Sequence, residues 1–295
     1  MQHLAVAASA LVPLPPLSSF PPDVAFAKIY EGAMWRTGDK RDQRIPLSGG
    51  GSTLEATNVT CKVLLAAVRH VTSKRRGPTR ILDTPCGDFT WMGSCLRRIA
   101  KELQPDGGSI VYRGIDVVSS LVDELHARGG HLLAGARDFN LGVPNVRILP
   151  FVQADASNLT QMVRFTGRVD VILSKHMLIH LPNAHVENVL HAWDSIGASL
   201  LVKDNTPNTR KTNRNTVMAG HHEVDVHAGP FHVAPPLCAQ PDAGLCAAQH
   251  KCNDRIEILS LPLARMTPVP DVATRLERMA AVPACDVWAA SKKFR

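Results

Sequence analysis

The sequence predicts an α/β protein in which helices cover both faces of a mainly parallel sheet. Short apolar runs that suit buried strands alternate with stretches of helical periodicity along most of the chain. The chain has 295 residues and 45% hydrophobic composition, which is enough for one large core. We therefore expect a single domain over residues 24–295, preceded by a disordered, Pro-rich tail over residues 1–23.

The first helix is expected over residues 53–72, after a polar, Gly-rich stretch. Ser52 and Glu55 have the spacing of a capping box, and apolar residues follow at helical intervals from Leu54 to Val71. An irregular loop is expected over residues 204–237. The other elements are expected as strands at 80–83, 110–116, 148–153, 169–173, 198–202, 255–261 and 286–290, and helices at 91–103, 119–130 and 186–193.

Charge and cysteine content exclude several classes of protein. The net charge is +7, but the basic residues form no long block and are not interleaved with aromatics, so a nucleic-acid partner is not expected. No uninterrupted apolar run is long enough to cross a membrane. The seven cysteines are odd in number and no two have CxxC spacing, which indicates reduced thiols and a cytoplasmic protein. A targeting segment in the Pro-interrupted tail is the alternative.

Polar residues close the expected strands in chain order. Asp83 ends the first strand and Asp116 the second, Asp155 follows the third, and residues Ser174 to His176 follow the fourth. Because ligands bind above the carboxyl ends of parallel strands, we expect these side chains to line one site. A carboxylate at the end of the second strand can accept hydrogen bonds from both ribose hydroxyls of a nucleoside.

The loop after the first strand is acidic. Asp83 and Asp88 flank Gly87, where a residue without Cβ lets a ligand approach the backbone closely. Two carboxylates disfavour a pyrophosphate and favour a cofactor that carries an ammonium and a sulfonium. The loop therefore predicts S-adenosylmethionine rather than NAD, whose loop normally carries further glycines and no acid.

The stretch from Ile81 to Met92, ILDTPCGDFTWM, resembles motif I of a little-characterised group of class I S-adenosylmethionine-dependent methyltransferases. Residues 29–35 with 48–57, 170–181, and 220–231 with 235–237 are similar to the same group. The resemblance covers most of residues 26–237. It implies a Rossmann-like class I methyltransferase fold with a mainly parallel seven-stranded sheet, and methyl transfer from S-adenosylmethionine, with the loop at 204–237 as a lid on the acceptor side.

The resemblance also places residues around the cofactor. Asp83 and Gly87 would face its methionine end, Asp116 its ribose, and Asp155 with Ala156 its adenine. The loop at 48–52 would close over it from the N-terminal side, together with a tryptophan. The full set expected to bind the cofactor is Trp35, Ser48, Gly49, Asp83, Thr84, Pro85, Cys86, Gly87, Asp88, Trp91, Asp116, Val117, Asp155, Ala156 and Ser174.

Methyl transfer needs alignment and, for an acceptor that carries a proton, a base. His180 is the first candidate for the base or acceptor-orienting group and His176 the second; if this stretch is helical, the two share a face. A packed or capping role for His180 is the alternative. The group usually has an acid at position 176 and a proline at position 50, so the sequence departs from its pattern at His176 and Gly50.

The segment from His221 to His227 is rich in histidines and acids. If it is extended, Glu223, Asp225 and His227 point the same way and could contact the acceptor or a metal, with a solvated loop as the alternative. The two cysteines and one histidine at 246–252 form an incomplete ligand set. No metal is predicted.

Several functions stay open beside the preferred one. Residues Ser174 to Met177 lack the proline and aromatic pattern of amino-directed nucleic-acid methyltransferases, and Cys86 is interpreted as a packing thiol. A non-catalytic domain that binds S-adenosylmethionine or S-adenosylhomocysteine, a protein methyltransferase and a nicotinamide-dependent oxidoreductase are the other candidates. A small-molecule acceptor is favoured because the expected lid has few aromatics and no basic groove. The sequence does not predict the number of subunits.

Overall fold

The computed structural model of the chain describes residues 17, 20–36, 46–132, 141–243, 253–268 and 270–291. Most of the expected tail and the residues at 246–252 lie outside these ranges. The strands are β1 Thr79–Asp83, β2 Ile110–Asp116, β3 Val146–Ile148, β4 Val152–Gln153, β5 Val171–Ser174, β6 Leu200–Asn205, β7 Cys238–Pro241 and β8 Arg255–Ser260. The α-helices are α1 Pro22–Glu31, α2 Asn58–Lys74, α3 Met92–Leu103, α4 Ser119–Leu132, α5 Leu159–Met162, α6 Asn183–Ile196, α8 Val272–Ala280 and α9 Cys285–Ser291.

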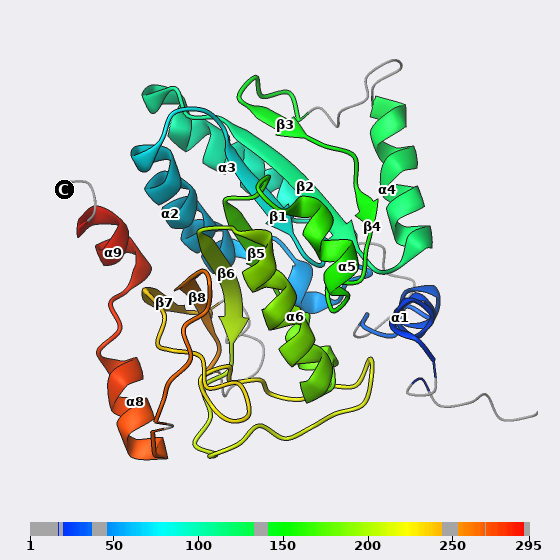
Figure 1. Cartoon of the computed structure of the whole chain (residues 1–295). Helices are drawn as coiled ribbons and strands as arrows, with labels where there is room; N and C mark the ends of the chain where they lie inside the picture. The colour runs from blue at the N-terminus through cyan, green and yellow to red at the C-terminus, as the bar shows by residue number, and fades with distance from the viewer. Residues whose placement is uncertain are drawn as a thin grey trace, which may run out of the picture.

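One sheet runs through the molecule in the order β3-β2-β1-β5-β6-β8-β7, and β4 also pairs with β2 (Figure 1). The first five of these strands are parallel, whereas β8 is antiparallel to both β6 and β7. The expected strand at 148–153 is divided between β3 and β4, because Pro150 has no N–H to donate to the ladder. The expected mainly parallel sheet with helices on both faces is confirmed, but in the described residues it has eight strands instead of the seven expected.

The direction of the chain across the sheet reverses beside β1. Strands β2 and β3 lie on one side of β1, and β5 to β8 lie on the other. The last residue of β1, Asp83, pairs in register with Leu173 of β5. The loops that follow these two strands therefore start side by side and run in opposite directions across the sheet. A topological switch of this kind opens a crevice at the carboxyl ends of the strands.

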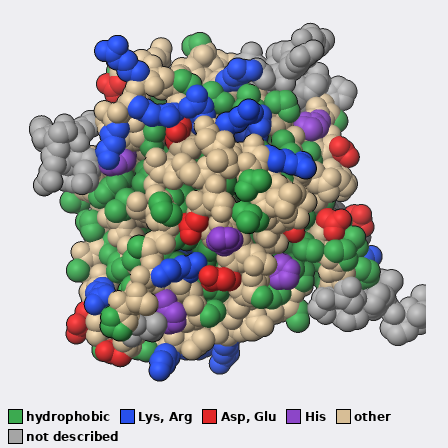
Figure 2. Space-filling view, viewed as in Figure 1, with side chains coloured by type: hydrophobic (Ala, Val, Ile, Leu, Met, Phe, Trp, Pro, Cys, Tyr) green, Lys and Arg blue, Asp and Glu red, His purple; other side chains and the backbone are tan. Residues whose placement is uncertain are grey.

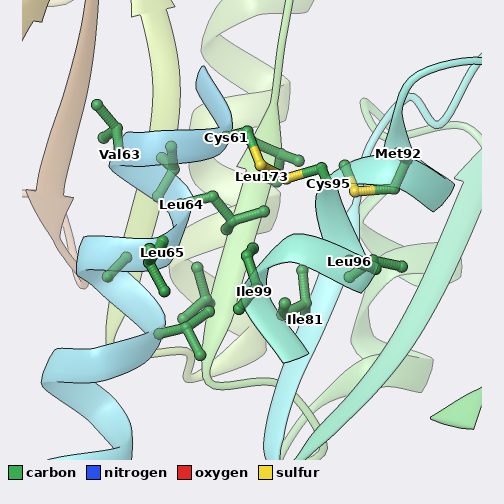
Figure 3. Close-up of a cluster of buried hydrophobic side chains, with 14 of the residues drawn as sticks. Cys61, Val63, Leu64, Leu65, Ile81, Met92, Cys95, Leu96, Ile99 and Leu173 are labelled. Carbon is green, nitrogen blue, oxygen red and sulfur yellow. A yellow bond between two sulfur atoms is a disulfide. The ribbon is translucent and has the colours of Figure 1, made fainter. Parts of the chain in front are cut away.

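Successive strand residues point into two apolar cores. Ile81 of β1 packs with α2, α3 and α9 on one face, and its neighbour Leu82 packs with α1 and α6 on the other. Figure 3 shows the first core, in which Leu64 of α2 and Ile99 of α3 meet Leu173 of β5. These packed layers hold the carboxyl ends of the strands in place.

Two elements at the ends of the described chain differ from expectation. Residues 22–31 form helix α1 instead of an irregular stretch, because Pro22 occupies the first helical position and Phe26 and Ile29 are buried. Residues 286–290 lie in helix α9 instead of a closing strand. Trp288 of this helix is buried and stacks on His70 of α2, with ring centroids 4.6 Å apart.

The start of α2 and strand β7 also differ from expectation. Helix α2 begins at Asn58 rather than at residue 53, because the hydroxyl of Thr53 accepts the N–H of Ala56 in a separate turn. Strand β7 had not been anticipated; it forms by pairing with β8, from Cys238 opposite Ile258.

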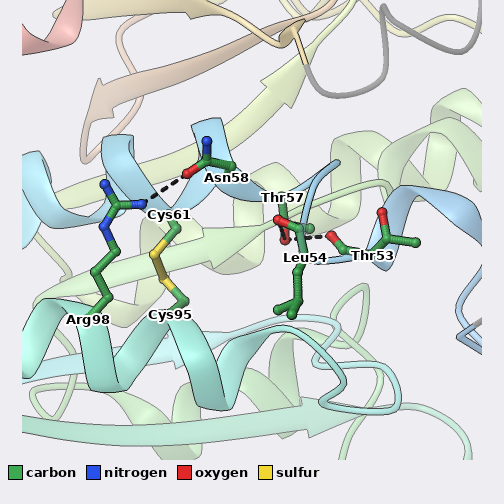
Figure 4. Close-up of a disulfide and its surroundings, with 7 residues drawn as sticks. All are labelled: Thr53, Leu54, Thr57, Asn58, Cys61, Cys95 and Arg98. Atoms are coloured by element: carbon green, nitrogen blue, oxygen red, sulfur yellow. Dashed lines mark hydrogen bonds between the residues drawn. A yellow bond between two sulfur atoms is a disulfide. The ribbon is translucent and has the colours of Figure 1, made fainter. Parts of the chain in front are cut away.

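Four cysteines form two disulfides, so the expectation of reduced thiols is wrong for them. Cys61 of α2 is bonded to Cys95 of α3 (Figure 4), and Cys238 of β7 to Cys285 of α9. The partners are 34 and 47 residues apart in sequence, and the fold brings them together. Cys86 is the free cysteine of the described residues and is buried. The prediction of a cytoplasmic protein rested on reduced thiols, and these two disulfides remove that support.

The surface shows where the basic excess lies. In Figure 2, Lys and Arg side chains gather on the upper part of the face, where the strands begin, and mix with Asp, Glu and His on the lower part. The basic residues of this face therefore gather away from the carboxyl ends of the strands. None of the helices in the described ranges has the length and apolar character needed to cross a bilayer.

Candidate functional site

A cavity of about 510 Å³ opens at the carboxyl ends of the strands. It is lined by the loops after β1, β2, β5 and β6, by α1 and by the residues around 48–52. This volume lies within the range of small-molecule sites. Of the residues expected to bind the cofactor, those that line the cavity are Trp35, Ser48, Gly49, Asp83, Thr84, Pro85, Cys86, Gly87, Asp88, Trp91, Asp116, Val117 and Ala156.

Two residues expected at the cofactor do not line the cavity. Asp155 turns back on its own loop, where Oδ1 accepts the N–H and the hydroxyl of Ser157, each at 2.8 Å. Ser174 is 1% exposed at the end of β5. The neighbours Ala154 and Ala156 line the cavity instead of Asp155.

The loop after β1 is held by backbone hydrogen bonds to both neighbouring strands. The N–H of Thr84 donates to Leu173 of β5, and the N–H of Cys86 donates to Ile115 of β2, each at 2.8 Å. The N–H of Gly87 donates to the carboxylate of Asp116 at 3.1 Å. The motif I loop and the acid at the end of β2 therefore form one rigid wall.

Ser48 and Asp88 join the N-terminal segment to this wall by two reciprocal bonds. The N–H of Ser48 donates to Oδ2 of Asp88, and the N–H of Asp88 donates to the hydroxyl of Ser48. Gly87 lies between them with φ of +54°, and a Cβ there would come 2.6 Å from Oγ of Ser48. The glycine is needed for this junction, which is a different reason from the close approach of a ligand that the sequence suggested.

Helix α1 brings aromatic residues to the cavity. Tyr30 and Phe26 line it beside Trp35, whose ring packs edge-on against Tyr30 at 5.5 Å. Burial and the nearby Asp116 raise the pKa of Tyr30, so its hydroxyl stays protonated. Sequence reasoning missed Tyr30 and Phe26 because it had not anticipated α1.

The carboxyl groups of the wall differ in charge. Burial raises the pKa of Asp83 to about 8, although the hydrogen bond that it accepts from the hydroxyl of Tyr112, at 2.6 Å, lowers the pKa in part. Burial raises the pKa of Asp116 only to about 6, because the N–H groups of Val118 and Gly87 stabilise its ionised form. At neutral pH without a ligand, Asp83 is therefore mostly protonated and Asp116 mostly ionised.

His176 lines the cavity in a constrained conformation. Its φ is +56°, so residues 176–180 do not form the continuous helix considered from the sequence. Its N–H donates to Asp204 at 2.8 Å, and Nε2 lies 3.3 Å from the ammonium of Lys175. Burial and Lys175 lower the pKa of His176 to about 3. The lone pair of Nε2 faces a donor, so His176, the second candidate for the base, is less suited to that role than His180.

His180 lines the same cavity with one nitrogen available. Nδ1 lies 2.7 Å from the carbonyl oxygen of Gly220, so Nδ1 carries the proton and Nε2 keeps a lone pair. The ring stacks on Trp35 with centroids 4.6 Å apart. Burial lowers the pKa of His180 to about 4. A neutral imidazole with a free Nε2 can accept a hydrogen bond or a proton.

Sequence reasoning missed Asp204 as a residue of the site and gave Lys175 no role of its own. Asp204, the residue before the end of β6, lines the cavity, as does Lys175, which follows β5. The ammonium of Lys175 pairs with Asp242 at 2.8 Å, and both side chains are buried. An acid at the end of an apolar run was the available signal for Asp204. Asp242 follows β7, and nothing in the sequence connects it with Lys175.

The expected lid is irregular, as predicted, but much of it is buried. Asp225 accepts the side-chain N–H of Asn205 from β6, and His227 lies with Nε2 3.0 Å from Glu257 of β8. Glu223 is exposed while Asp225 and His227 are 2% and 1% exposed, so these three do not point the same way. Within the described ranges, no three His, Cys, Asp or Glu side chains are grouped as metal ligands.

Comparisons with known proteins found structural likeness only. No family model and no curated protein matches the chain. The magnesium protoporphyrin IX methyltransferase ChlM from Synechocystis PCC 6803, solved with bound SAM, is 15% identical; the match covers 80% of this chain and 96% of that one, with a TM-score of 0.44. The 1,6-didemethyltoxoflavin-N1-methyltransferase of Burkholderia thailandensis is 16% identical; the match covers 88% of this chain and 98% of that one, with a TM-score of 0.43.

At this level of similarity the comparisons carry no conclusion about function. The strand order, the reversed β8 and the crevice at the switch point beside β1 define a Rossmann-like α/β fold. The function has to be inferred from the residues that line the cavity.

Proposed function

We propose that the protein transfers a methyl group from S-adenosylmethionine to a small-molecule acceptor. One observation carries the proposal: Asp83, Asp88 and Asp116 converge around Gly87 in a cavity that also holds His180. Acidic groups at the ends of neighbouring strands suit a cofactor that carries an ammonium, a sulfonium and a ribose. The same groups oppose the pyrophosphate of a dinucleotide.

The residues present fit this cofactor. Two backbone N–H groups fix the orientation of the Asp116 carboxylate, whose oxygens retain lone pairs for the ribose hydroxyls. Val117 and Ala156 would contact the adenine, and Asp83 the methionine end. Thr84 lines the cavity, and its buried hydroxyl has no hydrogen-bond partner within the described residues, so a polar ligand group would satisfy it.

The protein would contribute mainly alignment to the reaction. The bound cofactor supplies an electrophilic methyl group, and the acceptor must approach it in line with the breaking bond. Trp35 and the 48–52 loop would exclude water on the N-terminal side. His180 would orient the acceptor or take its proton at Nε2, since Nδ1 is held by Gly220.

A calorimetric titration with S-adenosylhomocysteine, followed by titration with NADH, tests the proposal. We expect saturable binding of S-adenosylhomocysteine, no displacement by NADH, and transfer of label from S-adenosylmethionine to a small acceptor. Absence of binding, or displacement by NADH, contradicts the proposal. Binding without transfer to small molecules, proteins or nucleic acids would favour a non-catalytic domain instead.

A further inference from the structure

The acceptor side of the cavity, meaning the lining residues after β5 and β6 and at 206–223 and 253–254, has its cationic side chains already paired. The ammonium of Lys175 lies 2.8 Å from Asp242, with side chains 6% and 0% exposed. At the rim, the guanidinium of Arg210 lies 3.8 Å from Glu223. The buried Lys175 is therefore not left to recognise an anionic ligand, and the exposed Arg210 already has a carboxylate beside it.

Two carboxyl groups of this region keep an oxygen for a ligand. Asp204 accepts the N–H of His176 through Oδ1, and Asp254 accepts the hydroxyl of Thr206 through Oδ1 at 2.6 Å. Oδ2 of each has no hydrogen-bond partner in the described part of the chain. Burial raises the pKa of Asp204, but His176, Lys203 and Lys175 together lower it by more, so the net shift is downward. Burial and Asp204 raise the pKa of Asp254. At least one negative charge therefore faces the acceptor.

Two imidazoles add further acceptor atoms. Nδ1 of His222 lies 2.7 Å from the carbonyl oxygen of Arg214 and so carries its proton. Nε2 of His222 is buried and has no partner among the described residues, although the residue lines the cavity and is 7% exposed. Nε2 of His180 is likewise available. A buried acceptor without a partner costs free energy that a ligand N–H recovers.

We propose that the methyl acceptor is a small amine that is cationic in solution. This inference rests on the proposed methyltransferase function. Four available polar atoms of this region, Oδ2 of Asp204 and Asp254 and Nε2 of His180 and His222, accept hydrogen bonds, and an ammonium group supplies both donors and a compensating charge. A carboxylate acceptor would meet like charge, and a polyol would leave the negative charge unpaired.

The amine reacts as its free base. Its ammonium form loses one proton to solvent, and Nε2 of His180 accepts a hydrogen bond from an N–H of the free base and orients its lone pair. The nitrogen lone pair then forms the new C–N bond while the C–S bond of the donor breaks, and the electron pair of that bond stays on sulfur. The products are the methylated ammonium ion, S-adenosylhomocysteine and one proton.

Label transfer from S-adenosylmethionine to three sets of probes tests the inference. The sets are amines (putrescine, histamine and phenylethylamine), polyols (glycerol and glucose) and carboxylates (succinate and benzoate), each with and without EDTA. We expect transfer to amines only, unaffected by EDTA. Asp204→Asn should lower kcat/KM for the best amine about tenfold or more and leave the affinity for S-adenosylhomocysteine nearly unchanged.

Asp123→Asn, at an exposed position on α4, is the matched control and should change neither quantity. Transfer to polyols or carboxylates, transfer that EDTA abolishes, or no transfer by a protein that binds S-adenosylhomocysteine overturns the inference. An unaltered kcat/KM in Asp204→Asn also overturns it. Loss of S-adenosylhomocysteine binding in the unmodified protein would instead overturn the proposed function.

Discussion

The carboxylate of Asp116, at the end of β2, accepts a hydrogen bond from the backbone N–H of Gly87, in the loop after β1, at 3.1 Å. Its other oxygen accepts the N–H of Val118, also at 3.1 Å. Two neighbouring strand ends thus orient one buried carboxylate before any ligand arrives. The cofactor side of the cavity is preorganised, so less conformational freedom is lost on binding.

Cofactor binding should release a proton from Asp83. Because burial raises its pKa to about 8, the free protein holds this proton at pH 7, and a bound ammonium or sulfonium would favour the ionised form. Calorimetric titration with S-adenosylhomocysteine in phosphate and in Tris should show release of up to about one proton. The Asp83→Asn variant should release none. Equal heats for the unmodified protein in the two buffers contradict the prediction.

His180 should stay neutral across the physiological range. Burial lowers its pKa to about 4, so the imidazole gains a proton only as the pH falls through that value. Nitrogen chemical shifts measured from pH 8 to 5 should show the Nδ1–H form that donates to Gly220. His180→Gln should lower kcat by roughly a hundredfold or more, with little effect on cofactor affinity. Titration of this histidine near pH 6.5 would argue against the prediction.

His227 should stabilise the fold as a buried cation. Both ring nitrogens face acceptors, Nδ1 the carbonyl of Val233 and Nε2 the carboxylate of Glu257. Although burial opposes the charge, Glu257 gives the pKa of His227 a net rise. A raised pKa stabilises the folded state below the unfolded value of about 6.5, and this contribution is lost as the pH rises through the folded value.

Replacing His227 by Gln should therefore lower the free energy of unfolding by about 3–5 kcal/mol near pH 6, since it leaves Glu257 buried without its cationic hydrogen-bond partner. Urea unfolding of both proteins between pH 5 and 9 measures this difference. The difference should shrink as the pH rises. A difference that grows with pH, or one that is absent at pH 6, contradicts the assignment of charge.

The two disulfides should contribute measurably to stability. They close segments of 34 and 47 residues, for which loss of chain entropy in the unfolded state predicts about 2–4 kcal/mol each. Peptide mapping without reductant should recover Cys61 linked to Cys95, and Cys238 linked to Cys285. The double variant Cys238→Ser, Cys285→Ser should melt at a lower temperature. Recovery of all four as free thiols from protein made under oxidising conditions would refute the pairing.

Much of the fold could be predicted from local pattern. The apolar run that ends at Asp116 gave β2 its observed bounds, and the acids at strand ends correctly located one edge of the sheet. Helix α1 was missed because consecutive prolines before Asp23 suggested a tail, although proline is favoured at a helix start. Helix α9 was mistaken for a strand because a short apolar run around Val287 and Trp288 does not distinguish the two.

The parts of the site that escaped prediction depend on distant pairs. Lys175 forms an ion pair with Asp242, which is 67 residues away in the sequence. Asp242 follows β7, a strand that forms by pairing with β8. Disulfide partners have the same property. Asp155 matched the expected pattern at its strand end, yet its carboxylate bonds to Ser157 and does not line the cavity. Pattern identifies where an acid lies on a strand, whereas the loop decides where its carboxylate points.

The affinity of Asp116→Asn for S-adenosylhomocysteine, compared with the unmodified protein and with Asp123→Asn, tests the central claim most directly. Asparagine keeps the shape of the side chain and removes its charge. We predict affinity at least about tenfold weaker for Asp116→Asn, an unchanged value for the exposed control, and unchanged folding of both by circular dichroism. Equal affinities in all three proteins, or no affinity in any of them, would contradict the claim that this carboxylate binds an adenosyl cofactor.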